Sequence, residues 1–416
     1  MDRLEITGPS RLTGRVAVSG AKNAALPLLA TGLMAETPLQ LANMPQLADT
    51  VSMMDLLAHH GLQIDRQPGA VTLSGSASQM DAPYDLVRKM RASILVLGPL
   101  LARYGQARVS LPGGCAIGTR PVDLHIRVMQ KLGAVVELAD GYIQARASRG
   151  LTGAKIEFPF VSVGATENAL MAASLAKGDT LLVNAAQEPE IIDLADCLVK
   201  MGARISGQGT SRIEIAGTDS LSGGHHSVMA DRIEAGSFAI AAAMTAGDLT
   251  LENLQPAHLE ALFAVMRDCG ITVTTTADEV QIIGPERVQA VDVATAPYPG
   301  FPTDLQAQYM AMMCLAEGQA RITETIFENR FMHVPELMRM GADIRIDGNT
   351  ALVTGKPSLL AAPVMATDLR ASISLVLAGL ASPGKTTVSR IYHLDRGYAD
   401  LEAKLGACGA RLARRS

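Results

Sequence analysis

Six segments of this chain are apolar at nearly every position, and they recur at regular intervals. They cover residues 24–33, 94–102, 169–176, 238–245, 307–316 and 373–380. A helix that is hydrophobic on all sides is typical of a protein interior, because a surface helix keeps one polar face. The sequence therefore predicts six helices that lie inside the fold.

A second signal follows each apolar segment. A turn and a short strand lead into an amphipathic helix that ends at a glycine, and the six glycines are Gly61, Gly133, Gly202, Gly270, Gly341 and Gly409. Glycine is favoured at the left-handed position that closes a helix. Short alternating segments, such as residues 134–137 and 343–346, follow most of these glycines and indicate strands.

Together the two signals define one repeating unit: a buried helix, a strand, an amphipathic helix and a pair of strands. The unit recurs about every 70 residues, six times in the chain. Repetition at a fixed period predicts an α/β protein whose packing is set by contacts between similar units. The period alone leaves their arrangement in space open.

Composition agrees with extensive burial. The chain has 416 residues, of which 48% are hydrophobic and only 19% are charged, against about 25% charged in ordinary soluble domains. No apolar run reaches the roughly 18 residues that suggest a membrane span, and the first residues lack the apolar core of a signal peptide. We expect a cytoplasmic protein of two or three domains, without a membrane association.

Charge and cysteine usage narrow the function classes further. The net charge is −5, aromatic residues make up 3% and tryptophan is absent, which argues against nucleic-acid binding. The five cysteines are scattered, without any C-x-x-C pair, so neither zinc nor a disulfide framework is indicated. Free thiols, no metal and no organic cofactor are expected, with small molecules as partners.

Polar residues gather where the buried helices begin. The six corresponding positions are Lys22, Arg91, Thr166, Arg232, Asp304 and Arg370. A helix N-terminus attracts anions and disfavours cations, so four cations at one repeat position need an explanation. Capping and surface charge explain any single position, whereas an anion-binding cleft explains the set better.

Residues 379–386, with the sequence GLASPGKT, match the P-loop pattern of nucleotide-binding proteins. That motif binds phosphates only between a strand and a following helix. Here an apolar helix precedes the motif and residues 386–391 indicate a strand. The sequence therefore predicts no nucleoside triphosphate site at this position.

Residues 112–121, with the sequence PGGCAIGTRP, place Cys115 among glycines and prolines, five residues before Arg120. Glycine and proline exclude a helix or a central strand, so the thiol is expected on a shaped loop. A thiol on such a loop near a cation has an adjustable pKa and access to a substrate. A surface turn that happens to include a cysteine is the alternative.

These segments resemble those of the UDP-N-acetylglucosamine enolpyruvyl transferases (1-carboxyvinyltransferases), within the enolpyruvyl transferase family. The resemblance extends over the whole chain and includes residues 20–25, 115–125, 161–166, 301–304 and 395–398. It implies a two-domain inside-out α/β barrel with three repeats per domain and the helices inside. The implied domains are residues 22–229, which carry the Cys115 loop, and residues 1–21 with 230–416.

The resemblance also implies a reaction. Members of this family transfer the enolpyruvyl group of phosphoenolpyruvate to the sugar 3-hydroxyl and release phosphate by addition and elimination. Cys115 resembles the acid that protonates C3, and it can be trapped as a covalent adduct with phosphoenolpyruvate. Asp304 resembles the base for the hydroxyl, although an acid in the first turn of a helix is commonly structural. Lys22, Arg120 and Arg396 resemble the cations that hold phosphoenolpyruvate.

The same resemblance assigns the remaining substrate contacts. Asn23 and Asp304 correspond to sugar contacts, and Ile326 to a backbone contact with the nucleotide sugar. The other implied substrate-binding residues are Arg91, Arg120, Pro121, Val122, Asp123, Leu124, Ser162, Val163, Gly164 and Arg370. His125 either steadies the loop or is an internally bonded histidine. Phe160 departs from the lysine of some members, so apolar packing on uracil would replace a charge contact there.

The implied role is the first committed step of peptidoglycan precursor synthesis, and thus cell wall biogenesis, cell shape and cell division, by a cytoplasmic monomer. Alternatives remain. A 5-enolpyruvylshikimate-3-phosphate synthase lacks this cysteine loop, and the net acidic charge disfavours an RNA 3′-phosphate cyclase. A silent paralogue that only binds nucleotide sugar is expected to have lost Lys22, Cys115, Asp304 or Arg396, and all four are present.

Overall fold

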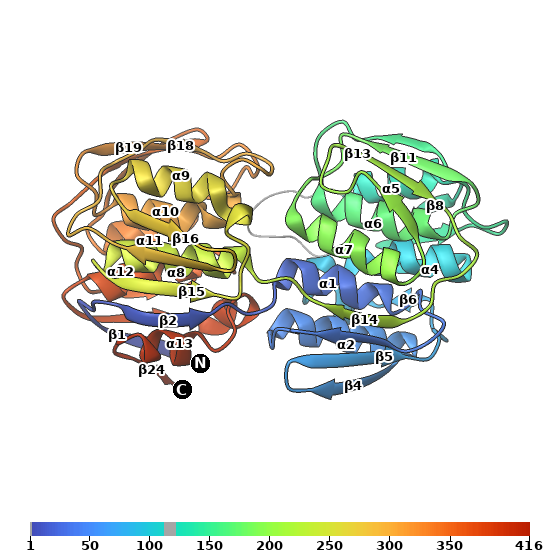
Figure 1. The fold of residues 1–416 in the computed structure, drawn as a ribbon, viewed down its shortest axis with the longest axis horizontal. Helices are drawn as coiled ribbons and strands as arrows, with labels where there is room; N and C mark the ends of the chain where they lie inside the picture. Colours follow the sequence, from blue (N-terminus) through green and yellow to red (C-terminus); the bar gives the residue numbers. More distant parts are fainter. Residues whose placement is uncertain (1, 112–121) are drawn as a thin grey trace. The chain divides into compact units, whose positions relative to one another are not determined.

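A computed structural model describes residues 2–111 and 122–416. They divide into two compact units (Figure 1). We call residues 20–111 and 122–229 the first unit, and residues 2–19 and 230–416 the second unit. Each unit has a hydrophobic core of its own.

The first unit contains three four-stranded sheets. Their strand orders are β14 (Gly224–Ser227), β3 (Leu39–Ala42), β5 (Ala70–Ser74), β4 (Gln63–Gln67); β6 (Asp81–Ala82), β7 (Gln106–Ser110), β9 (Tyr142–Arg146), β8 (Val135–Ala139); and β10 (Lys155–Glu157), β11 (Asp179–Val183), β13 (Arg212–Ala216), β12 (Arg204–Ser206). In each sheet the first two strands are parallel and the later pairs are antiparallel.

The second unit repeats this arrangement. Its sheets are β2 (Thr13–Ala17), β15 (Asp248–Glu252), β17 (Glu279–Ile283), β16 (Thr272–Thr275); β18 (Val293–Ala294), β19 (Gln319–Thr323), β21 (Thr350–Thr354), β20 (Asp343–Asp347); and β22 (Pro363–Met365), β23 (Gly384–Ser389), β1 (Arg3–Gly8), β24 (Leu412–Arg415). The same order of one parallel and two antiparallel pairings holds in all three. The predicted sixfold α/β repeat is confirmed.

The apolar segments form the buried helices, as predicted. They are α1 (Lys22–Thr31), η1 (Arg91–Val96) continued by α4 (Leu97–Tyr104), α6 (Val163–Ser174), α8 (Arg232–Met244), η3 (Thr303–Leu305) continued by α10 (Gln306–Met313), and α12 (Ser372–Ala381). Nearly every residue of α6, α8 and α12 is buried. The helices therefore lie inside and the sheets outside, which is the inside-out arrangement that the resemblance implied.

The amphipathic helices are α2 (Ala48–His60), α5 (Asp123–Lys131), α7 (Pro189–Lys200), α9 (Glu260–Asp268), α11 (Val334–Arg339) and α13 (Leu401–Ala407). Shorter helical segments are α3 (Tyr84–Val87), η2 (Pro256–Leu259) and η4 (Ile391–Arg396). All six closing glycines have positive φ, from 83° at Gly270 to 111° at Gly61. This left-handed backbone explains the choice of glycine.

The second unit is formed by two separate segments of the chain, residues 2–19 and 230–416. Strands β1 and β2 come from the N-terminus, yet they complete the last and the first sheet of the second unit. In the first unit, β14 pairs with β3, which lies near the other end of that segment of the chain. Sheet closure by distant strands therefore ties the ends of each unit together.

The structure also tests the predictions made for the P-loop-like segment and for the cysteines. The P-loop-like segment runs from α12 through a turn into β23, and its Thr386 pairs with Ile6 in the sheet, so it is a helix-turn-strand segment as predicted. Four of the five cysteines are described, and all four are free and buried: Cys197, Cys269, Cys314 and Cys408. Within residues 2–111 and 122–416, no helix has the length and apolar character that a membrane crossing requires.

Tight backbone packing where the strands meet the buried helices gives a first test. A Cβ atom at Gly355 would lie 1.8 Å from the Ala316 carbonyl oxygen. Gly355→Ala is therefore expected to destabilise the second unit by about 1–3 kcal/mol through overpacking. Thermal unfolding measures the effect. Gly406→Ala is the control, since nothing lies within 4 Å of a Cβ there; equal melting temperatures for the two variants would contradict the packing.

Candidate functional site

The predicted site residues occur in both units, at the ends of helices and strands. The first unit holds Lys22, Asn23, Arg91, Val122, Asp123, Leu124, Ser162, Val163 and Gly164, and the second holds Asp304, Ile326, Arg370 and Arg396. Cys115, Arg120 and Pro121 lie outside the described residues. The chain leaves β7 before that segment and enters α5 after it.

Lys22 is the first residue of α1 and is only 7% exposed. Its Nζ lies 3.1 Å from Oδ2 of Asp49, a buried residue in the first turn of α2. A buried ammonium group needs an opposite charge, so Asp49 holds Lys22 at the start of α1. The sequence does not single out Asp49, because its only signal there is an acidic residue near the start of an amphipathic helix.

His125 connects three of the predicted segments in the first unit. It lies in the first turn of α5, and its Nδ1 is 2.8 Å from Nδ2 of Asn168 in α6. The Asn168 amide also donates to the carbonyl of Ile94 in η1, at 3.0 Å. A Cβ at Gly164 would lie 3.2 Å from the imidazole ring. His125 is therefore an internally bonded histidine that connects α5 with α6 and, through Asn168, with η1.

The charge state of His125 follows from its surroundings. Burial, and then the nearby Arg91 guanidinium, lower the pKa of His125 to about 4. The ring is neutral at physiological pH, which suits its place between two helices. At the start of α6, the Ser162 side chain caps the helix by accepting from Ala165 N at 3.4 Å.

A group of buried glutamates lies where α6 and α7 begin. Burial, followed by repulsion from Glu190 and Glu188, raises the pKa of Glu167 to about 8. All three side chains are buried. Among the described residues, no group of three or more histidines, cysteines or acidic residues is arranged to hold a metal ion.

In the second unit, Asp304 lies between two arginines. Its Oδ1 is 2.8 Å from Nη2 of Arg330, and its Oδ2 is 3.5 Å from Nε of Arg370. Both arginine side chains are almost completely buried, whereas that of Asp304 is 24% exposed. Two buried cations thus fix the orientation of the carboxylate, while part of it remains exposed to solvent.

Arg370 connects the starts of the buried helices of this unit. It is 2% exposed, and its Nη2 lies 3.7 Å from Oδ2 of Asp231, which caps α8. Its Nη1 also donates to the carbonyl of Gly397 at 3.3 Å, directly after Arg396. Asp304, Arg370 and the η4 segment that ends at Arg396 are therefore brought together.

These ion pairs refine the expected anion-binding cleft. Lys22 and Arg370 face carboxylates of their own unit, and the Arg232 guanidinium lies 5.7 Å from the ring centroid of Tyr298. Thr166 has a structural role, since its Oγ1 donates to the Ser162 carbonyl at 2.8 Å and accepts from Ala186 N at 3.1 Å. The repeat position is therefore rich in charge, but Lys22, Arg232 and Arg370 each contact a side chain of their own unit.

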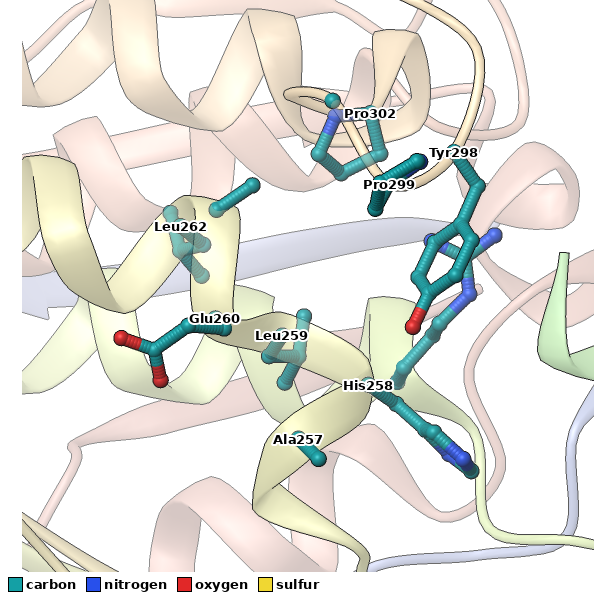
Figure 2. Close-up of a pocket in the computed structure, with 11 residues that line it drawn as sticks. Ala257, His258, Leu259, Glu260, Leu262, Tyr298, Pro299 and Pro302 are labelled. Carbon is teal, nitrogen blue, oxygen red and sulfur yellow. The ribbon is translucent and has the colours of Figure 1, made fainter.

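A small pocket lies beside Arg232, between the start of α9 and residues 298–302 (Figure 2). Figure 2 shows Tyr298 and His258 on one side and Leu259 and Leu262 on the other. The wall formed by residues 298–302 leads directly into η3, which carries Asp304. The pocket therefore adjoins the segment that positions the predicted base.

Ile326 follows β19, and its backbone is held by a buried glutamate, Glu324, that no motif in the sequence singles out. Glu324 Oε1 accepts hydrogen bonds from the backbone N–H of Ile326 and Phe327, at 2.8 and 3.1 Å. Glu324 Oε2 accepts from the hydroxyl of Thr303 at 2.8 Å. The same side chain therefore contacts the segments of two predicted site residues, Ile326 and Asp304.

Comparison with known proteins identifies relatives along the whole chain. A protein-family model described as EPSP synthase (3-phosphoshikimate 1-carboxyvinyltransferase) matches residues 6–405. A protein of Acidiphilium cryptum named UDP-N-acetylglucosamine 1-carboxyvinyltransferase is 57% identical over 416 residues, which cover 100% of this chain and 99% of the relative. A protein of the same name from Rhodospirillum centenum is also 57% identical, with the same coverage.

Solved structures agree with the fold. The enolpyruvyl transferase NikO from Streptomyces tendae superimposes with a TM-score of 0.89 and 28% identity, over 99% of this chain and 98% of that one. An EPSP synthase from Acinetobacter baumannii has a TM-score of 0.76 at 19% identity, over 100% of both chains; this second likeness concerns the fold alone.

The buried histidine gives a pH test. An unfolded histidine takes up a proton as the pH falls through about 6.5, while His125 in the folded chain stays neutral until about 4. Between these two pH values the unfolded state binds more protons than the folded state. The free energy of unfolding therefore decreases by about 1.4 kcal/mol for each unit by which the pH is lowered. When the pH is lowered from 7 to 5, the free energy of unfolding of His125→Gln should therefore decrease by about 2 kcal/mol less than that of the native chain.

Urea unfolding at the two pH values measures this difference. The exposed His225 provides the control, since His225→Gln should follow the native chain. Equal pH dependence of the native chain and His125→Gln would contradict a neutral, buried imidazole.

Proposed function

The chain belongs to the enolpyruvyl transferase family, and on that premise we propose that it transfers the enolpyruvyl group of phosphoenolpyruvate to the 3-hydroxyl of UDP-N-acetylglucosamine, with release of phosphate. The observation that carries the proposal is 57% identity along the whole chain to proteins named UDP-N-acetylglucosamine 1-carboxyvinyltransferase. The sugar hydroxyl adds to C2 while C3 takes a proton. Phosphate then leaves as C3 loses a proton, which restores the double bond.

Asp304 is the proposed base for the hydroxyl proton. A base has to reach the substrate while its side chain stays in one orientation. The two buried arginines beside Asp304 supply that orientation, and its partial exposure leaves room for a substrate atom. In this proposal Arg370 serves the substrate site by holding Asp304.

Cys115 is the proposed acid that delivers the proton to C3, and an adduct of its sulfur with phosphoenolpyruvate is a further proposed state. This role comes from the family resemblance, and Cys115 lies outside the described residues. By contrast, burial raises the pKa of the Cys197 and Cys314 thiols to about 12. These two thiols are therefore poor candidates for acid–base chemistry near neutral pH.

The proposed substrate contacts follow the same family pattern. Lys22, Arg120 and Arg396 bind phosphoenolpyruvate through its carboxylate and phosphate, and Asn23 contacts the sugar. The uridine diphosphate part is assigned to Arg91, residues 120–124, residues 162–164 and Ile326. The ion pair of Lys22 with Asp49 supports this role, because it keeps a cation at the start of α1.

Phe160 is proposed to pack on the uracil ring. Its side chain is 58% exposed, two residues before the Ser162 cap of α6. An aromatic ring on the surface beside a predicted nucleotide contact is suited to stacking. Apolar contact would thus replace the lysine found here in some family members.

A 3-phosphoshikimate acceptor is the second candidate, because the matching family model is described by that activity. The relatives that are 57% identical favour the nucleotide sugar instead. We further propose a monomeric cytoplasmic enzyme that acts without metal or organic cofactor, at the start of peptidoglycan precursor synthesis for the cell wall.

Phosphate release tests the reaction and the acid together. The native chain should release phosphate from phosphoenolpyruvate only when UDP-N-acetylglucosamine is present, and Cys115→Ala should reduce this rate by at least about 100-fold, as expected for loss of a general acid. Cys408→Ala is the control at a buried thiol. Unchanged release by Cys115→Ala would exclude the thiol from proton transfer.

A second variant tests the base. Asp304→Asn keeps the shape of the side chain but removes its basicity, so kcat should fall by about 100-fold or more, while calorimetry still detects binding of the nucleotide sugar. Asp268→Asn, at an exposed position in the same unit, should leave kcat unchanged. A native kcat in Asp304→Asn would contradict the assignment.

A further inference from the structure

Glu324 is a buried carboxylate at the end of a central strand, outside the residues assigned above. It directly follows β19 and is only 3% exposed. An ionised carboxylate accepts hydrogen bonds and donates none, and burial of one requires several donors. The contacts of Glu324 meet this requirement, because each hydrogen bond to it comes from an N–H or a hydroxyl donor.

One oxygen holds the backbone that follows β19. Oε1 accepts from the N–H groups of Ile326 and Phe327 and from the hydroxyl of Thr295 at 2.9 Å. Thr295 follows β18 and also accepts from Thr325 N at 2.9 Å. Residues 325–327 are thus fixed to the ends of two neighbouring strands.

The other oxygen holds the segment that carries the proposed base. Oε2 accepts from the hydroxyl of Thr303, the first residue of η3, at 2.8 Å. Asp304 is the next residue, and its carboxylate contacts the Arg330 and Arg370 side chains. Glu324 therefore restrains the backbone of Asp304, while the arginines orient its carboxylate.

We propose that Glu324 is a positioning residue that sets the distance between the base Asp304 and the nucleotide-sugar contact at Ile326. The inference rests on the proposed function, which gives Asp304 and Ile326 their roles. One rigid carboxylate bridges the two segments through its two oxygens. A shift of either segment would change where the sugar hydroxyl lies relative to the base, and small errors in such distances reduce rates strongly.

Three variants separate the two oxygens. Glu324→Ala removes both sets of bonds. Glu324→Gln removes the negative charge but keeps one acceptor oxygen for residues 326 and 327, and its NH₂ can donate to the Thr303 hydroxyl, which is also an acceptor. Thr303→Val removes only the donor to Oε2. Thr323→Val is the matched control, since the hydroxyl of this neighbouring residue in β19 pairs with Thr350 at 3.2 Å.

Steady-state kinetics and calorimetry with UDP-N-acetylglucosamine provide the readouts. Glu324→Ala should lower kcat and weaken nucleotide-sugar binding, each by about tenfold or more, as expected for lost hydrogen bonds to a charged group. Thr303→Val should lower kcat by about tenfold while the Kd of the nucleotide sugar stays within about twofold. Glu324→Gln, which can keep a hydrogen bond to each segment, should lower kcat less than Thr303→Val does. Thr323→Val should match the native chain in both.

The results decide between positioning and simple packing. A lower melting temperature of Glu324→Ala with native kcat and Kd would overturn the inference, as would native kcat in Thr303→Val. If Glu324→Ala does not fold, Thr303→Val carries the test. If the native chain binds the nucleotide sugar but releases no phosphate, the proposed function is wrong, but the inference about Glu324 is not yet decided. The effect of Glu324→Ala on the Kd of the nucleotide sugar then decides it.

Discussion

Burial of three helices that are apolar on all sides is the constraint on which each unit depends. Such helices have no polar face for solvent, so sheets have to enclose them, and four-stranded sheets of one repeated topology do so. The charged residues proposed for the site lie at or near the ends of these helices, where backbone groups also lack partners within the helix. Asp304 and Arg370 lie at such ends in the second unit, and Lys22 does so in the first.

Charges at these ends need partners inside the protein, because burial without them is too unfavourable. Asp49 balances Lys22, and Arg330 and Arg370 balance Asp304. The pairs also fix orientation, which is what acid–base chemistry and anion binding require. The same electrostatic requirement that permits the buried helices therefore also orients the side chains proposed for catalysis.

The sequence predicts those features that depend on local chemistry. All-round apolar segments identified the buried helices, and glycine at a left-handed position identified six helix ends. The sequence did not reveal strands as short as β6 and β18, with two residues each. The family resemblance placed residues 1–21 with residues 230–416, but it did not show which sheets β1 and β2 complete. Arg330 and Glu324 were missed because nothing local connects them with Asp304, 26 and 20 residues away.

Identification of the reaction product is the decisive test of the proposed transfer to UDP-N-acetylglucosamine. The native chain would be incubated with phosphoenolpyruvate and UDP-N-acetylglucosamine, and the product examined by mass spectrometry and NMR. We expect an enolpyruvyl ether on the 3-oxygen of the sugar, formed in equal amount with phosphate. Transfer to 3-phosphoshikimate instead, or an unchanged nucleotide sugar, would contradict it.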